Sequence, residues 1–280
     1  MAISVHTNKS ALTALQTLNR TNARLEESQN RINTGYKVAT AKDNAAVYAV
    51  AQNQRSDTAA LSAVASSMDR ATSILDVAMA AGESISDLLN QLKQKVVAVM
   101  DPSISVDSRA AYTNDFNALL KQIGGIVSNA KFDGANLING SFNDIQFLAD
   151  ADGASRITVA AKNLSWRTGT ASIMQLSSTE TMSTTTAASN VLARVELSIS
   201  RVNAALGQLG AHAREVEAHR TFVSKLSDVL EAGIGNLVDA DLAKESARLQ
   251  ALQVQQQLGT QALSIANQAP QVVLSLFRGQ

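Results

Sequence analysis

Apolar residues recur along much of this chain at intervals that alternate between three and four. The most regular run lies between Leu61 and Val99, with polar and charged residues between its members. A repeat of 3.5 residues over this length indicates a helix in a left-handed coiled coil or bundle. Such a helix would be about 57 Å long, and Pro102 predicts its end because proline disfavours a helical residue before it. The twelve members are Leu61, Val64, Met68, Ala71, Leu75, Ala78, Gly82, Ile85, Leu89, Leu92, Val96 and Val99.

Two further stripes follow. One covers residues 112–130, and a longer one covers residues 188–216. We expect the longer stripe to slip near Arg220 and to resume through Phe222, Leu226 and Val229. Each of these stripes predicts another helix of the bundle. The predicted core positions of the two long helices are Leu61, Met68, Leu75, Leu89, Leu92, Val96, Ile199, Val202, Leu206 and Leu209.

Both ends of the chain carry heptad spacing, over residues 11–32 and again over 242–263, where Gln256 and Gly259 interrupt it. Residues 250–277 contain no charged side chain. A helix that meets water on one face normally carries charge there. We therefore expect this segment to be surrounded by protein through association, rather than to be a polar tail. The predicted assembly residues are Leu18, Leu25, Ile32, Leu242, Leu249, Leu252, Leu258, Leu263, Val272, Leu274, Leu276 and Phe277.

The middle of the chain has a different pattern. Residues 144–149 and 156–160 are strand-like runs around a turn at Gly153, which predicts a β-hairpin. Residues 177–186 are rich in Ser and Thr and lack periodicity, so they predict an exposed loop. The fold class is therefore mainly α: a long antiparallel coiled coil or bundle of N- and C-terminal segments, with a small β-hairpin insertion. The two ends must pair because a single striped helix cannot bury its own stripe.

Composition narrows the function. Lys plus Arg and Asp plus Glu both number 24, so a general affinity for nucleic acid or anionic lipid is not expected. The chain has no cysteine, which excludes disulfides and thiolate chemistry. No apolar run approaches the roughly 20 residues of a membrane helix. No cleavable targeting signal is visible, so the sequence predicts a soluble chain or one that is exported without such a signal.

Candidate chemical sites have simpler explanations. His212 and His219 lie seven apart, whereas a metal site favours two His at i and i+4 with a third ligand. Asp150, Asp152 and Gly153 resemble the start of a calcium loop, but the later glutamate is missing. A charged helix face and a hairpin turn explain these residues. The sequence predicts no catalytic, cofactor or metal site, and hence no enzyme.

Motifs at both ends carry a family resemblance. The N-terminal ones are Thr7-Asn8, Leu18-Asn19, Arg31-Ile32-Asn33-Thr34-Gly35 and Ala41-Lys42-Asp43-Asn44-Ala45-Ala46. The later ones are Phe132-Asp133-Gly134-Ala135-Asn136-Leu137, Asp239-Ala240-Asp241, Gln256-Gln257-Leu258-Gly259 and Ala266-Asn267-Gln268-Ala269-Pro270-Gln271-Val272-Val273-Leu274-Ser275-Leu276-Phe277-Arg278. In this order they resemble the bacterial flagellins, most of all the short alphaproteobacterial ones, and together they span nearly the whole chain.

The resemblance implies a domain plan. Residues 1–45 and 240–280 would form an inner terminal coiled coil, and residues 46–239 a helical-bundle core. The hairpin and loop insertion would occupy about 135–187. The outer domains of longer flagellins are expected to be absent. The chain would be a structural subunit of the flagellar filament that assembles into a helical tube for motility.

The resemblance also implies partners and a location. The chain would polymerise with itself and with paralogous flagellins, after unfolded export through the flagellar type III channel to the extracellular flagellum. An export chaperone would bind the C-terminal segment, and cap and hook–filament junction proteins would contact the filament. Some flagellins carry O-linked sugars on exposed hydroxyls. The candidates here are Ser177, Ser178, Thr179, Thr181, Ser183, Thr184, Thr185 and Thr186.

Two other classes of helical protein compete with this interpretation. A hook–filament junction protein shares the terminal helices but usually matches these motifs more weakly. A helical signalling rod, such as a chemoreceptor, would need a hairpin tip and usually membrane segments. Electron microscopy under polymerising conditions separates a filament subunit from both.

Overall fold

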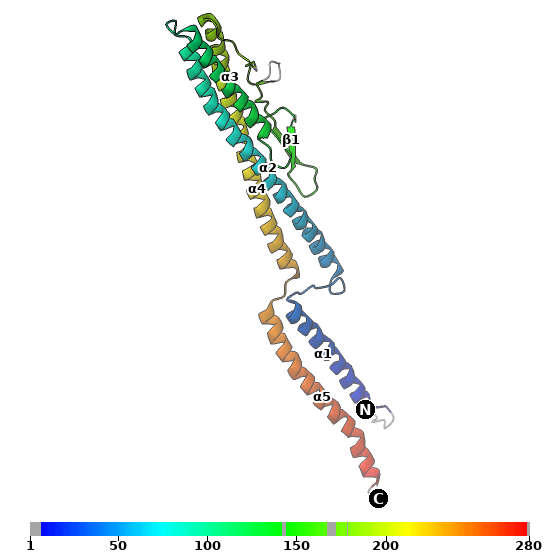
Figure 1. Cartoon of the computed structure of the whole chain (residues 1–280). Coiled ribbons are helices and arrows are strands. Elements are labelled where there is room, and N and C mark those ends of the chain that lie inside the picture. Colours follow the sequence, from blue (N-terminus) through cyan, green and yellow to red (C-terminus); the bar gives the residue numbers. More distant parts are fainter. Residues whose placement is uncertain (1–6, 142–143, 167–171, 178, 279–280) are drawn as a thin grey trace. The chain divides into compact units, whose positions relative to one another are not determined.

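The computed structural model describes residues 7–141, 144–166, 172–177 and 179–278, with the backbone alone for 269–278. The elements are α1 (Lys9–Thr34), α2 (Ala45–Val99), α3 (Val106–Asn129), β1 (Asp144–Leu148), β2 (Arg156–Ala160), α4 (Thr185–Val238) and α5 (Leu242–Arg278). They form two compact units. We call Met1–Ser56 with Val229–Gln280 the terminal unit, and Asp57–Asp228 the core unit. The mainly α fold with a small hairpin agrees with the prediction (Figure 1).

Three helices make the framework of the core unit. Within it α2 and α4 run side by side (Figure 1). They are antiparallel, because Arg220 pairs with Asp69 and Glu196 with Lys93. All twelve positions of the predicted α2 stripe are buried. The stripe is therefore the inner face of a bundle, as its 3.5-residue repeat indicated.

A tight turn joins α2 to α3. Arg109 Nη1 donates to the carbonyl oxygen of Val99 at 2.8 Å, which satisfies an acceptor at the end of α2. Ser105 caps α3 by accepting from the Ser108 amide at 3.1 Å. The turn brings Lys95 to within 2.8 Å of Asp115, so α3 folds back along α2. The predicted stop before Pro102 is confirmed, since α2 ends at Val99.

One member of the α2 stripe is glycine because of its neighbour. A Cβ atom at Gly82 would lie 2.6 Å from Leu206 Cδ2, which is closer than real Cβ contacts. Glycine at this position therefore lets α4 approach α2 with a leucine in the seam. In the same unit, a Cβ atom at Gly124 of α3 would clash with Trp166 Nε1, so this glycine makes room for the indole.

The predicted hairpin forms and packs on the helices. β1 and β2 are antiparallel with Phe147 opposite Ile157, and both side chains are buried. The tip is held at two points: the Leu148 amide donates to Ser67 Oγ at 3.2 Å, and His219 Nε2 lies 2.6 Å from the Ala149 carbonyl oxygen. His219 is thus half-buried against the hairpin, which the expected charged helix face did not anticipate.

Two expectations for this unit were wrong. The α4 stripe does not slip near Arg220, because Val223 continues the seven-residue repeat in the core while Phe222 is 56% exposed. The Ser/Thr-rich stretch is not a fully exposed loop, because Glu180 and Met182 are buried. α4 also begins within it, at Thr185.

The terminal unit pairs α1 with α5 (Figure 1). Gly35 ends α1 in the left-handed conformation at φ 74°, and its amide donates to the Arg31 carbonyl oxygen. The chain then runs beside residues 238–240: the Val38 amide donates to Val238 O, and the Ala240 amide to Gly35 O. A small apolar cluster of Val38, Ala51, Ile234 and Val238 lies here.

Candidate assembly surface

The pairing of α1 with α5 is a heptad seam between antiparallel helices. Asn8 Nδ2 donates to Ala266 O at 2.7 Å and Gln256 Nε2 to Asn22 Oδ1 at 2.9 Å. The seam positions of α1 are Ala11, Ala14, Leu18, Thr21, Leu25, Ser28 and Ile32. Those of α5 are Glu245, Leu249, Leu252, Gln256, Gly259, Leu263 and Ala266. All are buried or half-buried, so the seam closes even though small and polar residues occupy much of it.

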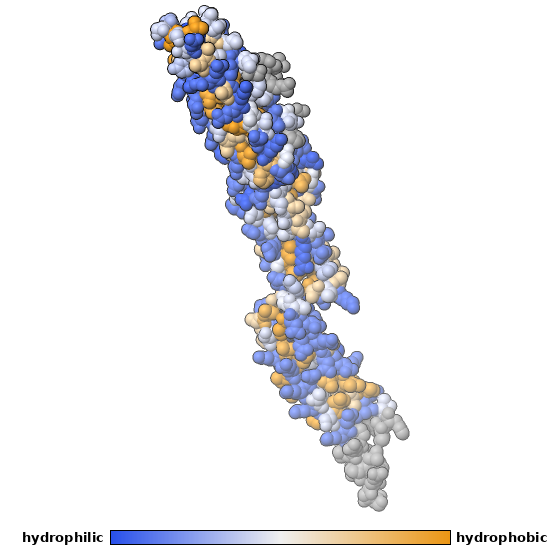
Figure 2. All heavy atoms as spheres, in the orientation of Figure 1, coloured by the Kyte–Doolittle hydropathy of each residue, from blue (hydrophilic) through white to orange (hydrophobic). Residues whose placement is uncertain are grey.

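Apolar side chains are also exposed on the outer faces of the same helices, on α1 among many polar ones. Leu258 is 59% exposed and Ile265 69%, and Val254 lies on the same face of α5, since intervals of four and seven return to one side of a helix. Leu12 and Leu15 are exposed on α1. Figure 2 shows apolar residues gathered in patches on the surface of this unit. Exposed apolar area of this kind marks an interaction surface.

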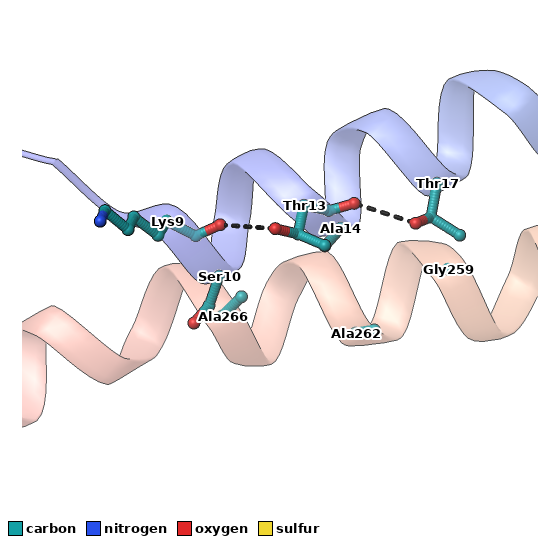
Figure 3. A pocket seen from close by; sticks show the side chains of 8 residues that line it. All are labelled: Lys9, Ser10, Thr13, Ala14, Thr17, Gly259, Ala262 and Ala266. Carbon is teal, nitrogen blue, oxygen red and sulfur yellow. Dashed lines mark hydrogen bonds between the residues drawn. The ribbon is translucent and has the colours of Figure 1, made fainter. Parts of the chain in front are cut away.

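A shallow groove of about 620 Å³ lies between α1 and α5 (Figure 3). Its lining residues are Lys9, Ser10, Thr13, Ala14, Thr17, Gly259, Ala262 and Ala266. The hydroxyls of Thr13 and Thr17 each donate to a carbonyl oxygen of their own helix at 3.0 Å. A lining of alanine, glycine and internally bonded threonine favours close packing against another helix over capture of a polar ligand.

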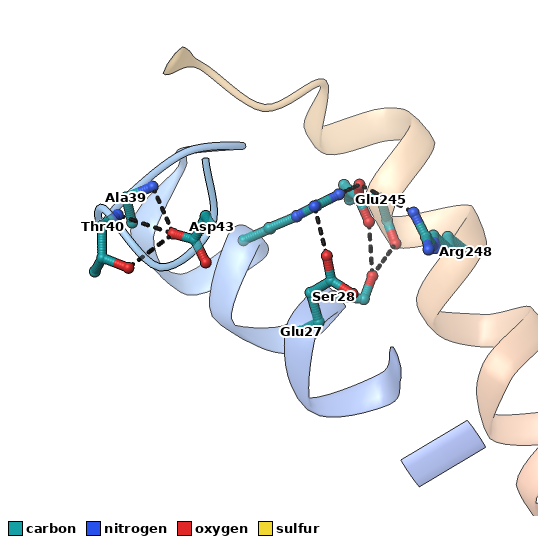
Figure 4. Close-up of polar contacts among 8 residues, drawn as sticks. Glu27, Ser28, Ala39, Thr40, Asp43, Glu245 and Arg248 are labelled. Carbon is teal, nitrogen blue, oxygen red and sulfur yellow. Dashed lines mark hydrogen bonds and ion pairs between the residues drawn. The ribbon is translucent and has the colours of Figure 1, made fainter. Parts of the chain in front are cut away.

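One carboxylate of the seam, that of Glu245, is buried, and Figure 4 shows its polar contacts. Ser28 Oγ donates to Glu245 Oε2 at 2.8 Å, and Arg31 Nη1 donates to Glu245 Oε1 at 3.0 Å. Burial alone raises the pKa of Glu245. The hydrogen bonds from Ser28 and Arg31 and the charges of Arg248 and Arg31 oppose it, and the net pKa lies below its usual value. Sequence reasoning missed Glu245, although it stands seven residues before Leu252 in the heptad.

A second carboxylate organises the turn before α2 (Figure 4). Asp43 Oδ2 accepts from the Thr40 amide at 2.8 Å and from the Ala39 amide at 3.1 Å. The hydrogen bond that the Thr40 backbone amide donates to Asp43 holds the pKa of this carboxyl below its ordinary value. Asn44 Oδ1 then accepts from the Val47 amide at 3.2 Å, a capping contact that starts α2. Asp43 and Asn44 therefore have a structural role in the motif that contains them.

The predicted assembly residues divide into three groups. Leu18, Leu25, Ile32, Leu249, Leu252 and Leu263 lie in the seam. Leu242 and Leu258 are exposed. Val272, Leu274, Leu276 and Phe277 lie in the helical backbone of α5, and their side chains are outside the described part. The predicted core positions all lie in the core unit. Leu61, Met68, Leu75, Leu89, Leu92, Val96, Val202 and Leu209 are buried, and Ile199 and Leu206 are partly buried.

The hydroxyl-bearing segment of the core unit is anchored by Glu180. Arg194 binds the Glu180 carboxylate through Nη1 and Nη2 at 2.8 and 2.7 Å. Asn117 exchanges two hydrogen bonds with the backbone of Glu180. Six of the hydroxyl-bearing residues are exposed: Thr179, Thr181, Ser183, Thr184, Thr185 and Thr186. Ser177 is half-buried, and Ser178 is outside the described residues. The anchor thus presents a run of hydroxyl groups at the surface.

The remaining candidate chemistry is confined to single contacts. Among the described residues, no cluster of three or more His, Cys, Asp or Glu side chains could hold a metal ion. His212 Nδ1 lies 3.3 Å from Glu215 Oε2, within one turn of α4. No helix in the described part of the chain is both long enough and apolar enough to span a membrane.

The fold and this surface define a class: a helical structural protein with a compact core unit and a pair of terminal helices that expose apolar side chains. The bacterial flagellin N-terminal helical region matches residues 5–143, and the bacterial flagellin C-terminal helical region matches residues 192–277. The chain therefore belongs to the bacterial flagellins, and it is a structural subunit of the flagellar filament.

Curated relatives agree with this assignment over their full lengths. Flagellin FljJ of Caulobacter vibrioides is 50% identical over 282 residues, with both chains covered completely. A flagellin of Brucella melitensis is 39% identical, with 99% of each chain covered. Flagellin C of Rhizobium meliloti is 33% identical, with 98% of this chain and 99% of that protein covered. The similarity thus extends across the core unit as well as the terminal helices.

Proposed function

We propose that subunits of this chain join through the outer faces of α1 and α5, which pack against terminal helices of neighbouring copies. The observation that supports this is the exposed apolar face of α5, with Val254, Leu258 and Ile265, in a stretch without charge. Burial of such surface is the main driving force of association. A surface that binds a different surface on the next copy generates an open helical array. The product is a helical tubular filament used for motility.

The terminal helices, residues 1–45 and 240–280, form the inner domain of this filament in our proposal. Residues 46–239 form its helical-bundle domain, with the insertion of about 135–187 outside. One observation supports this plan: the terminal unit and the core unit are each compact, with residues 46–56 and 229–239 belonging to the terminal unit. The outer domains of longer flagellins are absent from this plan.

The proposal extends to the partners of a filament subunit. The chain leaves the cell unfolded through the flagellar type III channel, and a chaperone shields its uncharged C-terminal segment beforehand. Cap and hook–filament junction proteins contact the filament, and paralogous flagellins enter it. Neither nucleic acid nor membrane is a partner, and the role is structural rather than enzymatic. The equal charge counts and the exposed apolar face of α5 support this set.

Exposed hydroxyls of the segment anchored by Glu180 are proposed acceptors of O-linked sugar. The support is their position: six of them are on exposed residues, beside an anchor that keeps the segment ordered. The mass of the intact protein purified from native filaments tests this. A mass above that of the sequence by whole sugar units is expected, and a mass equal to that of the sequence contradicts it.

Electron microscopy of the purified chain under polymerising conditions tests the function itself. The parent is expected to form filaments. Leu258→Glu should abolish them, because it places a charge on the proposed interface, while helical content stays that of the parent. Gln253→Glu is the matched control, since it introduces the same residue at an exposed position of α5 that lies on a different side of the helix from Val254 and Leu258. Filaments of Leu258→Glu in normal amount would contradict the proposed surface. A parent that adds only to the ends of existing filaments would favour a hook–filament junction protein.

A further inference from the structure

The sequence of α1 is compatible with more than one heptad register of pairing with α5. Residues 18–24 and 25–31 are successive heptads with the same key positions: Leu18 matches Leu25, Thr21 matches Ser28, and Arg24 matches Arg31. A slip of one heptad preserves which face of a helix is apolar. The leucines of the seam therefore cannot by themselves choose the observed register.

Backbone hydrogen bonds of Val38 and Gly35 to residues 238–240 hold the end of α1 next to the start of α5. Within the seam, one contact that depends on register is the buried carboxylate. Glu245 is 8% exposed and is the one ionisable residue among the fourteen described seam positions. It meets Ser28 and Arg31 near the end of α1, which stops at Thr34. If α5 moved one heptad further toward that end, Glu245 would pass beyond α1 and lose both donors. A slip in this direction is opposed by the loss of charge-assisted hydrogen bonds.

The opposite slip is not opposed by Glu245, because Thr21 and Arg24 would replace Ser28 and Arg31 as its donors. A second contact opposes it. Leu18 packs on Gly259 so closely that a Cβ atom there would lie 3.2 Å from Leu18 Cδ1. After this slip Gly259 would face the region of Ala11, where the small side chain leaves a gap in the seam. Unfilled volume in a packed interface is destabilising.

We propose that Gly259 and Glu245 are register-determining residues, each of which prevents the terminal helices from pairing one heptad out of place in one direction. Leu18 packs on Gly259 at one point of the seam, and the buried Glu245 carboxylate accepts hydrogen bonds from Ser28 and Arg31 at another. The other leucines of the seam supply adhesion that is common to all three registers. This inference goes beyond the filament role, because it concerns how one chain pairs its own two ends.

Engineered cysteine pairs can measure the register, because the chain has no cysteine of its own. Gln256 touches Asn22 in the observed register, and Leu15 and Gln29 stand one heptad on either side of Asn22 on the same face of α1. The pairs Asn22→Cys/Gln256→Cys, Leu15→Cys/Gln256→Cys and Gln29→Cys/Gln256→Cys therefore report the three registers. Each full-length variant is diluted into filaments of the cysteine-free parent, so that a disulfide joins two sites of one chain.

Without further changes, the first pair should link at least about tenfold more than the others, a ratio expected from one charge-assisted hydrogen bond. Adding Gly259→Leu should move linkage to the Leu15 pair, and adding Glu245→Ala should raise linkage of the Gln29 pair. Gly233→Leu is the control for the first change, since no atom lies within 4 Å of that helical glycine's Cβ position. Glu27→Ala is the control for the second, since Glu27 is the exposed partner of Arg31.

Equal linkage of the three pairs in the otherwise unchanged chain would overturn the proposal, as would Gly259→Leu leaving their ratios unaltered. If Gly259→Leu is excluded from filaments, Gly259→Ala replaces it, since alanine adds only the Cβ atom. The test relies on the proposed polymerisation, but failure of the polymerisation and failure of the register proposal give different results. Absence of parent filaments counts against the function, whereas intact filaments with mixed linkage count against the register contacts alone.

Discussion

The core unit and the terminal unit share a heptad spacing but bury different kinds of side chain. The core unit buries large side chains completely, among them Met68, Phe116 and Leu120. Of the described seam positions that join α1 to α5, the buried ones are Thr21, Ser28, Glu245 and Leu252, and the others are half-buried. Because burial energy follows apolar area, the first pattern stabilises a fold within one chain. The second buries less apolar area between its two helices and leaves apolar side chains exposed, which we propose pack against other subunits.

Phe116→Ala should produce the largest effect, because it empties a fully buried aromatic site in the core unit. We expect a loss of about 3–5 kcal/mol in the free energy of unfolding. Urea unfolding followed by the fluorescence of Trp166 measures it, since this single tryptophan packs against the same core. A loss under about 1 kcal/mol would mean that the core unit is no better packed than the seam.

Arg194→Met should have the next largest effect. It leaves the buried Glu180 carboxylate without its two guanidinium donors, and losing hydrogen bonds to a charged group costs about 1.5–3 kcal/mol. Limited proteolysis should cut residues 177–184 faster, and the urea midpoint should fall. Lys93→Met is the control, because its pair with Glu196 is exposed and contributes less than about 1 kcal/mol. Equal effects of the two changes would show that Glu180 is not an anchor.

The sequence predicted the core unit well and the seam less well, for one physical reason. Large apolar residues at regular spacing indicate a buried helix face, which is why the α2 stripe could be predicted. Pro102 predicted the stop, and two strand-like runs around Gly153 predicted the hairpin. Val223 was missed because Phe222 beside it is larger and looked like the stripe's continuation. Glu245 and Glu180 were missed because a charge is expected in water. Only the positions of Ser28 and Arg31, or of Arg194 and Asn117, show that these carboxylates are buried among donors.

The acid dependence of the α1–α5 pair should distinguish the seam from an ordinary leucine seam. The lowered pKa of Glu245 means that its stabilisation is fully present above the usual value of 4.5 and is lost as pH falls through the lower, folded-state value. Glu245→Gln should therefore lower stability at neutral pH and reduce its further loss in acid. The thermal midpoint of the helical signal between about pH 7 and about pH 3 measures this, with Glu27→Gln as control. Parallel acid profiles of Glu245→Gln and the parent would contradict it.

Phe222→Ser should have the smallest effect on the isolated chain and test whether the core unit also carries an assembly surface. The ring is 56% exposed on α4, so its removal should change the free energy of unfolding by less than about 0.5 kcal/mol. If Phe222 packs against a neighbouring subunit, the same change should lower the temperature at which filaments dissociate while leaving the Trp166 unfolding curve in place. Filaments as heat-stable as those of the parent would confine assembly to the terminal helices, and the two units would then differ in function as fully as they differ in packing.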